Sequence, residues 1–148
     1  MQKVIILSGL PASGKTQWAN EQIKQFPNRY KNICKDNLRK MFDNSFWSHK
    51  NEDFIVKVRN SLILMSVESG FDVIISDTNL NPDHEIQIRL LVEGKAEVEI
   101  KFLDVDVNEC IRRDVLRQNP VGEKVIMDMY LKYLYKFPHN MQKEKGLM

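Results

Sequence analysis

Four short segments rich in apolar and β-branched residues alternate along the chain with stretches of helical periodicity. They cover residues 3–8, 32–34, 73–75 and 97–104. Apolar runs of this length are typical of strands that are buried on both faces. Strands separated by helices require crossover connections, which favours a parallel sheet. The pattern predicts an α/β domain with a parallel sheet of about four strands and helices on both faces.

Helical sequence fills the intervals between the strands. Ser69-Gly70 ends one helical pattern, and Asn81-Pro82-Asp83 begins another, with Asn81 as N-cap and Pro82 at the first helical position. Besides the helix that starts at Asn81, helices are expected over residues 15–26, 37–42, 52–68, 107–117 and 124–137.

A complete phosphate-loop pattern, GxxxxGK[ST], lies between the first strand and the first helix. Its glycines let backbone N–H groups turn toward phosphate oxygens, and the helix N-terminus adds a favourable dipole. We expect Lys15 to reach the β- and γ-phosphates of ATP or another NTP, and Thr16 to bind Mg²⁺. The remaining loop residues expected around the nucleotide are Gly9, Pro11, Ala12, Ser13 and Gly14.

Other phosphate-loop classes are disfavoured by motifs that the sequence lacks. It contains neither the NKxD nor the DxxG motif of GTPases. The third strand continues into Asp77-Thr78 rather than Asp-Glu, so the water-activating glutamate of motor-type ATPases is missing. A phosphotransferase with a separate acceptor fits best.

The acceptor of such a reaction needs a group that orients or deprotonates its hydroxyl. Asp36 follows the second strand, at the sheet edge where α/β proteins bind ligands, and Arg39 shares its helix face. Asp36 is either this base or only the cap of the helix over 37–42. Residues 24–40 contain one acid and six basic residues, which form either a site for a phosphate-bearing acceptor or a solvated face: Lys24, Arg29, Lys31, Lys35, Arg39 and Lys40.

Two further groups complete the expected site. Asp77, at the end of the third strand, either orders Mg²⁺-bound water or the Lys15–Thr16 pair, or is a structural strand-end aspartate. Arg113 and Arg117 are four residues apart, which predicts one helix face. Arg117 precedes a Pro-Gly connection and is expected to close over the β- and γ-phosphates with help from Arg113. The alternative is a pair of solvated helix arginines.

The composition limits the cellular location and the binding partners to be expected. The chain has 148 residues, with 22 Lys and Arg against 20 Asp and Glu, and its net charge of +2 argues against bulk coating of nucleic acid. The longest apolar run is too short for a bilayer, and two cysteines cannot build a disulfide framework. We therefore expect a cytoplasmic protein with no membrane partner. Its protein partners are left open.

These residues resemble the kinase domain of phage-type polynucleotide 5′-hydroxyl kinases, which are P-loop kinases. The resemblance runs from Lys3 to about Tyr133. It rests on the phosphate loop, on Lys35-Asp36-x-x-Arg39 and on IISDTNLNP at residues 74–82, and the flap arginines and Met129-Tyr130 add to it. It implies that Asp36 is the general base and that Arg39 contacts the acceptor-end phosphate. It further implies that Lys15, Thr16 and Arg117 act on the donor phosphates, and that Asp77 supports the loop.

The implied activity is ATP- and Mg²⁺-dependent phosphorylation of a 5′-hydroxyl end of DNA or RNA. Many relatives are fused to a 3′-phosphatase domain, whereas we expect a single kinase domain over residues 1–148. The segment Asp43–Asp53 has no counterpart in the resemblance and is expected to shape the acceptor entrance. The alternatives are a kinase that acts on a nucleoside or a sugar, and a nucleotide-gated binding module without transfer.

Overall fold

The computed structural model describes residues 1–135, in which four strands form one parallel sheet in the order β2-β3-β1-β4. Ile6 of the central strand β1 pairs with Ile75 on one side and with Ile100 on the other. The predicted parallel four-stranded sheet is confirmed. Its strands are β1 (Gln2–Ser8), β2 (Tyr30–Ile33), β3 (Asp72–Ile75) and β4 (Ala96–Phe102).

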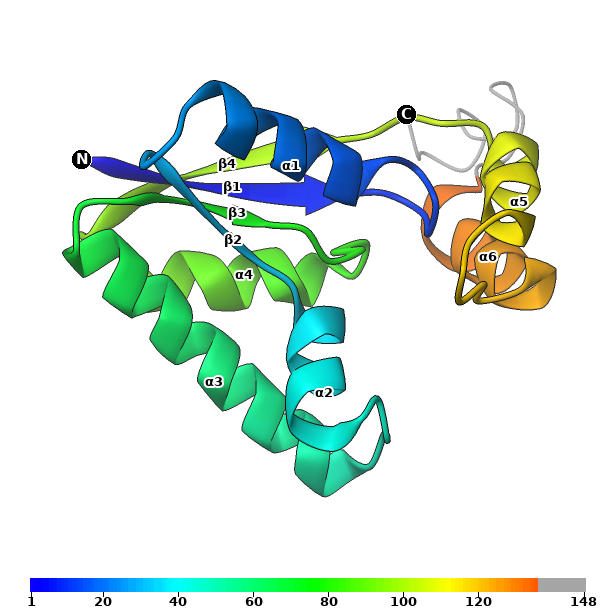
Figure 1. Cartoon of the computed structure of the whole chain (residues 1–148), viewed down its shortest axis with the longest axis horizontal. Helices are drawn as coiled ribbons and strands as arrows, with labels where there is room; N and C mark the ends of the chain where they lie inside the picture. The colour runs from blue at the N-terminus through cyan, green and yellow to red at the C-terminus, as the bar shows by residue number, and fades with distance from the viewer. Residues whose placement is uncertain (136–148) are drawn as a thin grey trace, which may run out of the picture.

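Helices cover both faces of this sheet, as predicted. Figure 1 shows α1 on one face, α3 and α4 on the other, and α5 and α6 beyond the carboxyl ends of the strands. The helices are α1 (Lys15–Gln25), α2 (Lys35–Asp43), α3 (His49–Glu68), α4 (Pro82–Leu91), α5 (Val107–Val115) and α6 (Glu123–Met129), followed by the π-helical turn η1 (Tyr130–Leu134).

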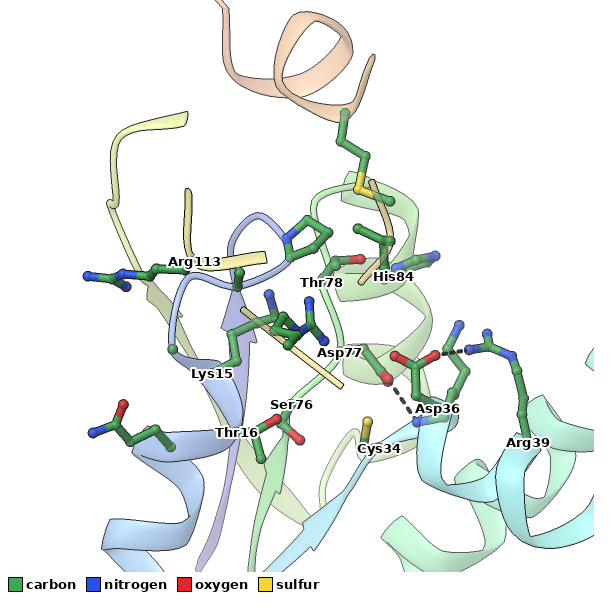
Figure 2. A pocket seen from close by; sticks show the side chains of 18 residues that line it. Lys15, Thr16, Cys34, Asp36, Arg39, Ser76, Asp77, Thr78, His84 and Arg113 are labelled. Carbon is green, nitrogen blue, oxygen red and sulfur yellow. Dashed lines mark hydrogen bonds and ion pairs between the residues drawn. The ribbon is translucent and has the colours of Figure 1, made fainter. Parts of the chain in front are cut away.

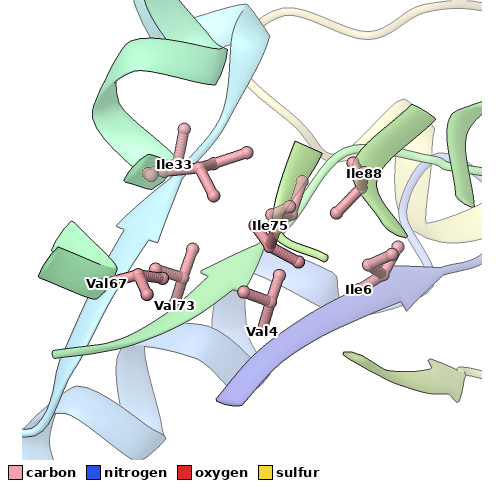
Figure 3. Packing of buried hydrophobic residues seen from close by; sticks show 9 residues of the cluster. Val4, Ile6, Ile33, Val67, Val73, Ile75 and Ile88 are labelled. Carbon is pink, nitrogen blue, oxygen red and sulfur yellow. The ribbon is translucent and has the colours of Figure 1, made fainter. Parts of the chain in front are cut away.

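Successive residues of β1 point into two different hydrophobic cores. Val4 and Ile6 pack toward α3 and α4 in the cluster drawn in Figure 3. Ile5 and Leu7 pack toward α1. Burying a side chain of this size contributes about 1.5–3 kcal/mol. The continuous apolar run of β1 is therefore explained by burial on both sides, and it holds the following loop on a rigid base.

Several boundaries differ from the prediction. The strand expected over 97–104 already ends at Phe102, and the helix expected from residue 52 begins at His49 because the Ser48 hydroxyl accepts a hydrogen bond from the Asn51 amide at 3.1 Å. The last expected helix ends at Met129 and continues as η1, while its predicted end at Phe137 lies outside the described residues. None of the helices within residues 1–135 combines the length and the hydropathy that a membrane crossing requires.

Candidate active site

A cavity of about 590 Å³ opens at the carboxyl ends of the strands, since many of its lining residues directly follow β1, β2 or β3. Its wall contains the phosphate loop, the start of α2, the segment after β3, the start of α4 and the connection between α5 and α6 (Figure 2). All of the predicted catalytic residues line it: Lys15, Asp36, Arg39 and Arg117. Pro11, Ala12, Gly14, Thr16, Asp77 and Arg113 line it as well.

The phosphate loop needs glycine at two positions for different reasons. A Cβ at Gly9 would lie 2.6 Å from the Ser13 hydroxyl oxygen and 3.2 Å from the Leu103 carbonyl oxygen, so the loop leaves no room for a side chain there. Gly14 has a φ of +98°, which side chains rarely adopt. The loop then enters α1 through the hydrogen bond from the Trp18 amide to the Gly14 carbonyl. Leu10 packs with buried Cys110 and Ile126, which ties the loop to α5 and α6.

The Lys15 ammonium is folded back into its own loop. Its Nζ donates to the carbonyl oxygens of Gly9 and Leu10 at 2.9 and 2.6 Å and to the Ser13 hydroxyl at 3.3 Å. The residue is 8% exposed, and burial lowers the pKa of Lys15 from 10.5 to about 8. The three acceptors are uncharged, so a phosphate group that displaced the carbonyl oxygens would give the Lys15 ammonium a negatively charged hydrogen-bond partner.

Thr16 and Asp77 offer oxygen ligands of the kind that Mg²⁺ prefers. The Thr16 residue is exposed and faces the cavity. Asp77 is 9% exposed, and its Oδ1 accepts a hydrogen bond from the Lys35 amide at 2.8 Å. Its Oδ2 is buried without a hydrogen-bond partner, and burial raises the pKa of this carboxyl group. The free oxygen fits a cation or its bound water. Residues 1–135 hold no cluster of three metal-ligating side chains, so nucleotide oxygens and water would complete the shell.

Asp36 does not cap α2, so the alternative role that the sequence left open is wrong. The N-cap is Cys34, and Asp36 lies within the first turn with its side chain 82% exposed. Its Oδ1 accepts a hydrogen bond from Arg39 Nη1 at 2.5 Å. Asp36 and Asp77 both line the cavity, and in Figure 2 Arg39 lies on the side of Asp36 that is away from Asp77. The Asp36 carboxylate is thus accessible to a ligand.

Glu52 on α3 orients Arg39, a role that the sequence did not reveal. Arg39 Nε and Nη2 donate to the two carboxylate oxygens of Glu52 at 2.8 and 2.7 Å. The hydrogen bonds from Arg39 lower the pKa of Glu52, and Lys35 Nζ lies 3.6 Å from the same carboxylate. The two partners are thirteen residues apart on different helices, so no local pattern marks the pair.

The basic segment at residues 24–40 does not form one surface. Lys35 and Arg39 line the cavity. Arg29 precedes the opposite end of β2, where its Nε lies 3.1 Å from Asp72 Oδ2 and its guanidinium covers the Tyr30 ring. Because β2 separates the two groups, only the residues after the strand can serve the acceptor.

The expectation that Arg113 and Arg117 share a helix face is wrong. Helix α5 ends at Val115, and the Arg117 amide bonds to the Asp114 carbonyl in a tighter turn at 3.0 Å. Both arginines still line the cavity, but the Arg113 guanidinium points away from Lys15 in Figure 2, and its Nε lies 3.5 Å from Glu109.

Asp114, which the sequence did not single out, organises the connection between α5 and α6. It is 2% exposed, and its carboxylate accepts hydrogen bonds from the amides of Val121 and Gly122 at 3.0 and 2.9 Å. Arg117 Nη1 donates to it at 3.2 Å. Burial opposes ionisation, but these amides and Arg117 outweigh it and lower the pKa of Asp114. The carboxylate therefore holds both sides of the loop beside the cavity.

One further polar residue, His84, was missed, whereas Asn79 shapes the turn after β3. His84 lines the cavity from α4, its Nδ1 is buried without a hydrogen-bond partner, and burial lowers its pKa. Asn79 has a φ of 48°, and its Nδ2 donates to the Leu7 carbonyl at 2.7 Å, which joins the ends of β1 and β3. The IISDTNLNP stretch was the available signal, since both residues lie in or beside it.

A parallel sheet in this strand order, with a complete phosphate loop after its first strand, is a P-loop kinase-like fold. The chain belongs to the AAA domain family AAA_33, whose family model matches residues 4–134.

The proteins that this chain resembles have names that refer to different substrates or complexes. Over 136 residues the chain is 30% identical to the L-seryl-tRNA(Sec) kinase of Methanococcus maripaludis, a match that covers 88% of this chain and 52% of that protein. The chain thus spans about half the length of that relative. A chain in the structure of the Pnkp1/Rnl/Hen1 RNA repair complex superposes with a TM-score of 0.77 at 24% identity, over 97% of this chain and 46% of that one. The Mycobacterium tuberculosis APS kinase CysC, in complex with AMPPNP and APS, gives 0.61 at 19% identity, over 76% and 68%.

Proposed function

We propose that this domain transfers the γ-phosphate of ATP to the 5′-hydroxyl end of DNA or RNA. One observation carries the proposal: a single cavity is lined by the phosphate loop and by the accessible Asp36–Arg39 pair. Phosphoryl transfer depends on positioning donor and acceptor and on stabilising charge, and both groups of residues are present in this wall.

Each residue has a distinct task in this reaction. The loop amides and Lys15 hold the donor phosphates, and Arg117 stabilises charge on the group in transfer. Mg²⁺, held by Thr16 and by Asp77 directly or through water, would neutralise charge on the donor phosphates. Asp36 accepts the proton of the attacking hydroxyl, while Arg39 binds the phosphate that follows the acceptor nucleoside. Glu52 keeps the Arg39 guanidinium in place for that contact.

The similar proteins favour an acceptor that is carried by RNA. The names of two of them refer to RNA, one to an RNA repair complex and the other to a seryl-tRNA kinase. The second name supports an alternative acceptor, a hydroxyl on an RNA-linked group. The likeness to APS kinase supports the other alternative, a small-molecule acceptor.

The test is incubation with γ-labelled ATP, Mg²⁺ and a 5′-hydroxyl oligonucleotide, with the 5′-phosphorylated oligonucleotide as control. We expect label at the 5′ end only in the first case. Asp36→Asn should reduce turnover by about 10²–10⁴-fold and leave ADP binding unchanged, because the carboxylate contacts the acceptor. An absence of label transfer, or a fully active Asp36→Asn variant, would contradict the proposal.

A competition panel separates the alternatives. If a nucleoside, a sugar or a seryl-tRNA prevents oligonucleotide labelling and is itself phosphorylated more efficiently, that acceptor class replaces the proposed one. Nucleotide binding without any acceptor-dependent release of ADP would instead identify a nucleotide-gated binding module.

A further inference from the structure

Four aromatic side chains are exposed where α2 connects to α3: Phe42, Phe46, Trp47 and Phe54, here called the aromatic surface. Their exposed fractions are 46%, 67%, 54% and 50%. Clustered exposed apolar groups on a protein surface mark interaction sites more often than single ones do. The position of this cluster, next to the acceptor side of the cavity, raises the question of its ligand.

The loop that carries two of these rings has a defined conformation. Asn44 and Ser45 have φ values of 49° and 66°, a left-handed backbone that side chains disfavour. The Ser45 amide bonds to the Arg39 carbonyl at 3.0 Å, and the Phe46 amide bonds to the Asp43 carbonyl at 2.9 Å. These bonds fix a strained turn that holds Phe46 outward, as strained backbone at binding sites often does.

The rings support one another from the side. Phe42 and Phe54 pack edge to face with centroids 5.4 Å apart, and Trp47 packs against His49 at 4.8 Å. Such pairs restrict ring motion, so a ligand that stacks on them loses less entropy in ordering the site.

The aromatic surface begins within one helical turn of a residue that lines the acceptor side of the cavity. Phe42 follows Arg39 by three residues on α2, and Phe54 follows Glu52 by two residues on α3. The Arg39–Glu52 hydrogen bonds and the Phe42–Phe54 ring contact therefore both join α2 to α3, at positions no more than three residues apart on each helix. At 1.5 Å per residue, Phe42 lies about 9 Å along the helix from Asp36, a span of roughly two to three stacked nucleotides.

Exposed positive charges around the aromatic surface favour a polyanionic ligand. Lys40, Lys50 and Lys57 are exposed and form no ion pair in the part of the chain that the structure describes. Of the acids in residues 40–57, Asp53 is exposed, whereas Asp43 is partly buried and Glu52 is paired with Arg39. Aromatic rings combined with free lysines suit the bases and phosphates of a single strand better than a protein surface.

We propose that the aromatic surface binds the unpaired bases that follow the acceptor nucleotide. This rests on the proposed function, because it assigns the acceptor of the same cavity: a single-stranded 5′-hydroxyl end of at least three nucleotides. Phe46 and Trp47 stack on the second and third bases, while Arg39 holds the phosphate next to the reacting nucleoside.

Trp47 fluorescence tests binding independently of transfer. The chain has two tryptophans, and Trp18→Phe leaves Trp47 as the only one. We expect quenching of this variant by a 5′-hydroxyl hexanucleotide, and much less by the same oligonucleotide with abasic second and third positions. Quenching without phosphorylation would support nucleic-acid binding by the aromatic surface and refute the proposed function. Equal quenching by both oligonucleotides, or none at all, would overturn this inference.

Kinetics supply the second test. Phe46→Ala and Trp47→Ala should each raise the KM for the hexanucleotide about tenfold and leave the KM for ATP unchanged. The control is Phe26→Ala, which removes another exposed aromatic side chain (38% exposed) that lies outside the cavity wall and outside the aromatic surface. If the hexanucleotide KM stays the same in both variants while the wild-type protein is active, the aromatic surface does not bind nucleic acid.

Discussion

The ionisation of Lys15 makes nucleotide binding depend on pH in a defined direction. Burial lowers its pKa from 10.5 to about 8, which corresponds to about 3 kcal/mol against the charged form. With this pKa, about 90% of the free protein carries the Lys15 charge at pH 7, but only about 10% carries it at pH 9. A bound β-phosphate favours the charged form, so binding should draw a proton from solvent.

Isothermal titration calorimetry with ADP measures this proton directly. At pH 8.5 we expect uptake of about 0.75 proton per nucleotide, obtained by comparing two buffers with different ionisation enthalpies. The affinity should be nearly flat below pH 7.5 and should fall by up to about tenfold per pH unit above pH 8. The loss occurs on the alkaline side because the lowered pKa removes the charge there.

Lys15→Arg is the matched control. Arginine keeps its charge throughout this pH range, so the variant should show no proton uptake from this position. Other titrating groups, including the Cys34 thiol in the same cavity wall, remain in both proteins and cancel in the difference. Equal proton uptake by the two proteins, or an affinity independent of pH from 7 to 9.5, would refute the assignment of the buried ammonium to the phosphates.

Three substitutions test the supporting residues. Asp114→Asn removes the carboxylate that binds the Val121 and Gly122 amides and Arg117. We expect this variant to lose about 1–2 kcal/mol in unfolding free energy, or about 4 °C in Tm, and to have a several-fold higher KM for ATP. The control is Asp128→Asn, at an exposed pair with Lys124, which should change neither the stability nor the KM. Since folding lowers the pKa of Asp114, the contribution of its carboxylate to the unfolding free energy should be lost as the pH falls below about 4. A stability difference between wild type and Asp114→Asn that persists at pH 2 would contradict this role. Glu52→Gln should raise the KM for the oligonucleotide several-fold and leave the KM for ATP unchanged, because Arg39 loses its charged partner. The control is Asp53→Asn, and an effect of equal size from it would argue against a specific Arg39–Glu52 pairing. Gly9→Ala should weaken ADP binding by at least tenfold, since its Cβ would meet the Ser13 hydroxyl at 2.6 Å and the Leu103 carbonyl at 3.2 Å; unaltered binding in calorimetry would show that the loop can widen at no cost.

Local sequence predicted the parts of this protein that depend on neighbouring residues. The apolar runs predicted buried strands because β1 and β3 are covered on both faces. Asn81 caps α4 as expected, with its side chain accepting a hydrogen bond from the Asp83 amide at 3.0 Å. The phosphate loop is contiguous, so its pattern of glycines and Lys15 could be read without knowledge of the fold.

Contacts between helices and strands that are far apart in the chain could not be predicted from local sequence patterns. The pairing of Arg39 with Glu52 depends on how α2 packs on α3, and the hydrogen bond from the Lys35 amide to Asp77 depends on β2 lying beside β3. The basic residues on either side of β2 were separated, with Arg29 before the strand and Lys35 and Arg39 after it, because a strand carries its flanking residues to opposite edges of the sheet.

The sequence by itself thus determined the domain class and the phosphate-binding loop, since short-range patterns specify both. The tertiary structure decided which charges act together, since Asp114 meets the Gly122 amide only when the chain turns back after α5. It also decided that Asp36 is accessible rather than a helix cap, because the position of α2 relative to the cavity follows from packing and not from propensity.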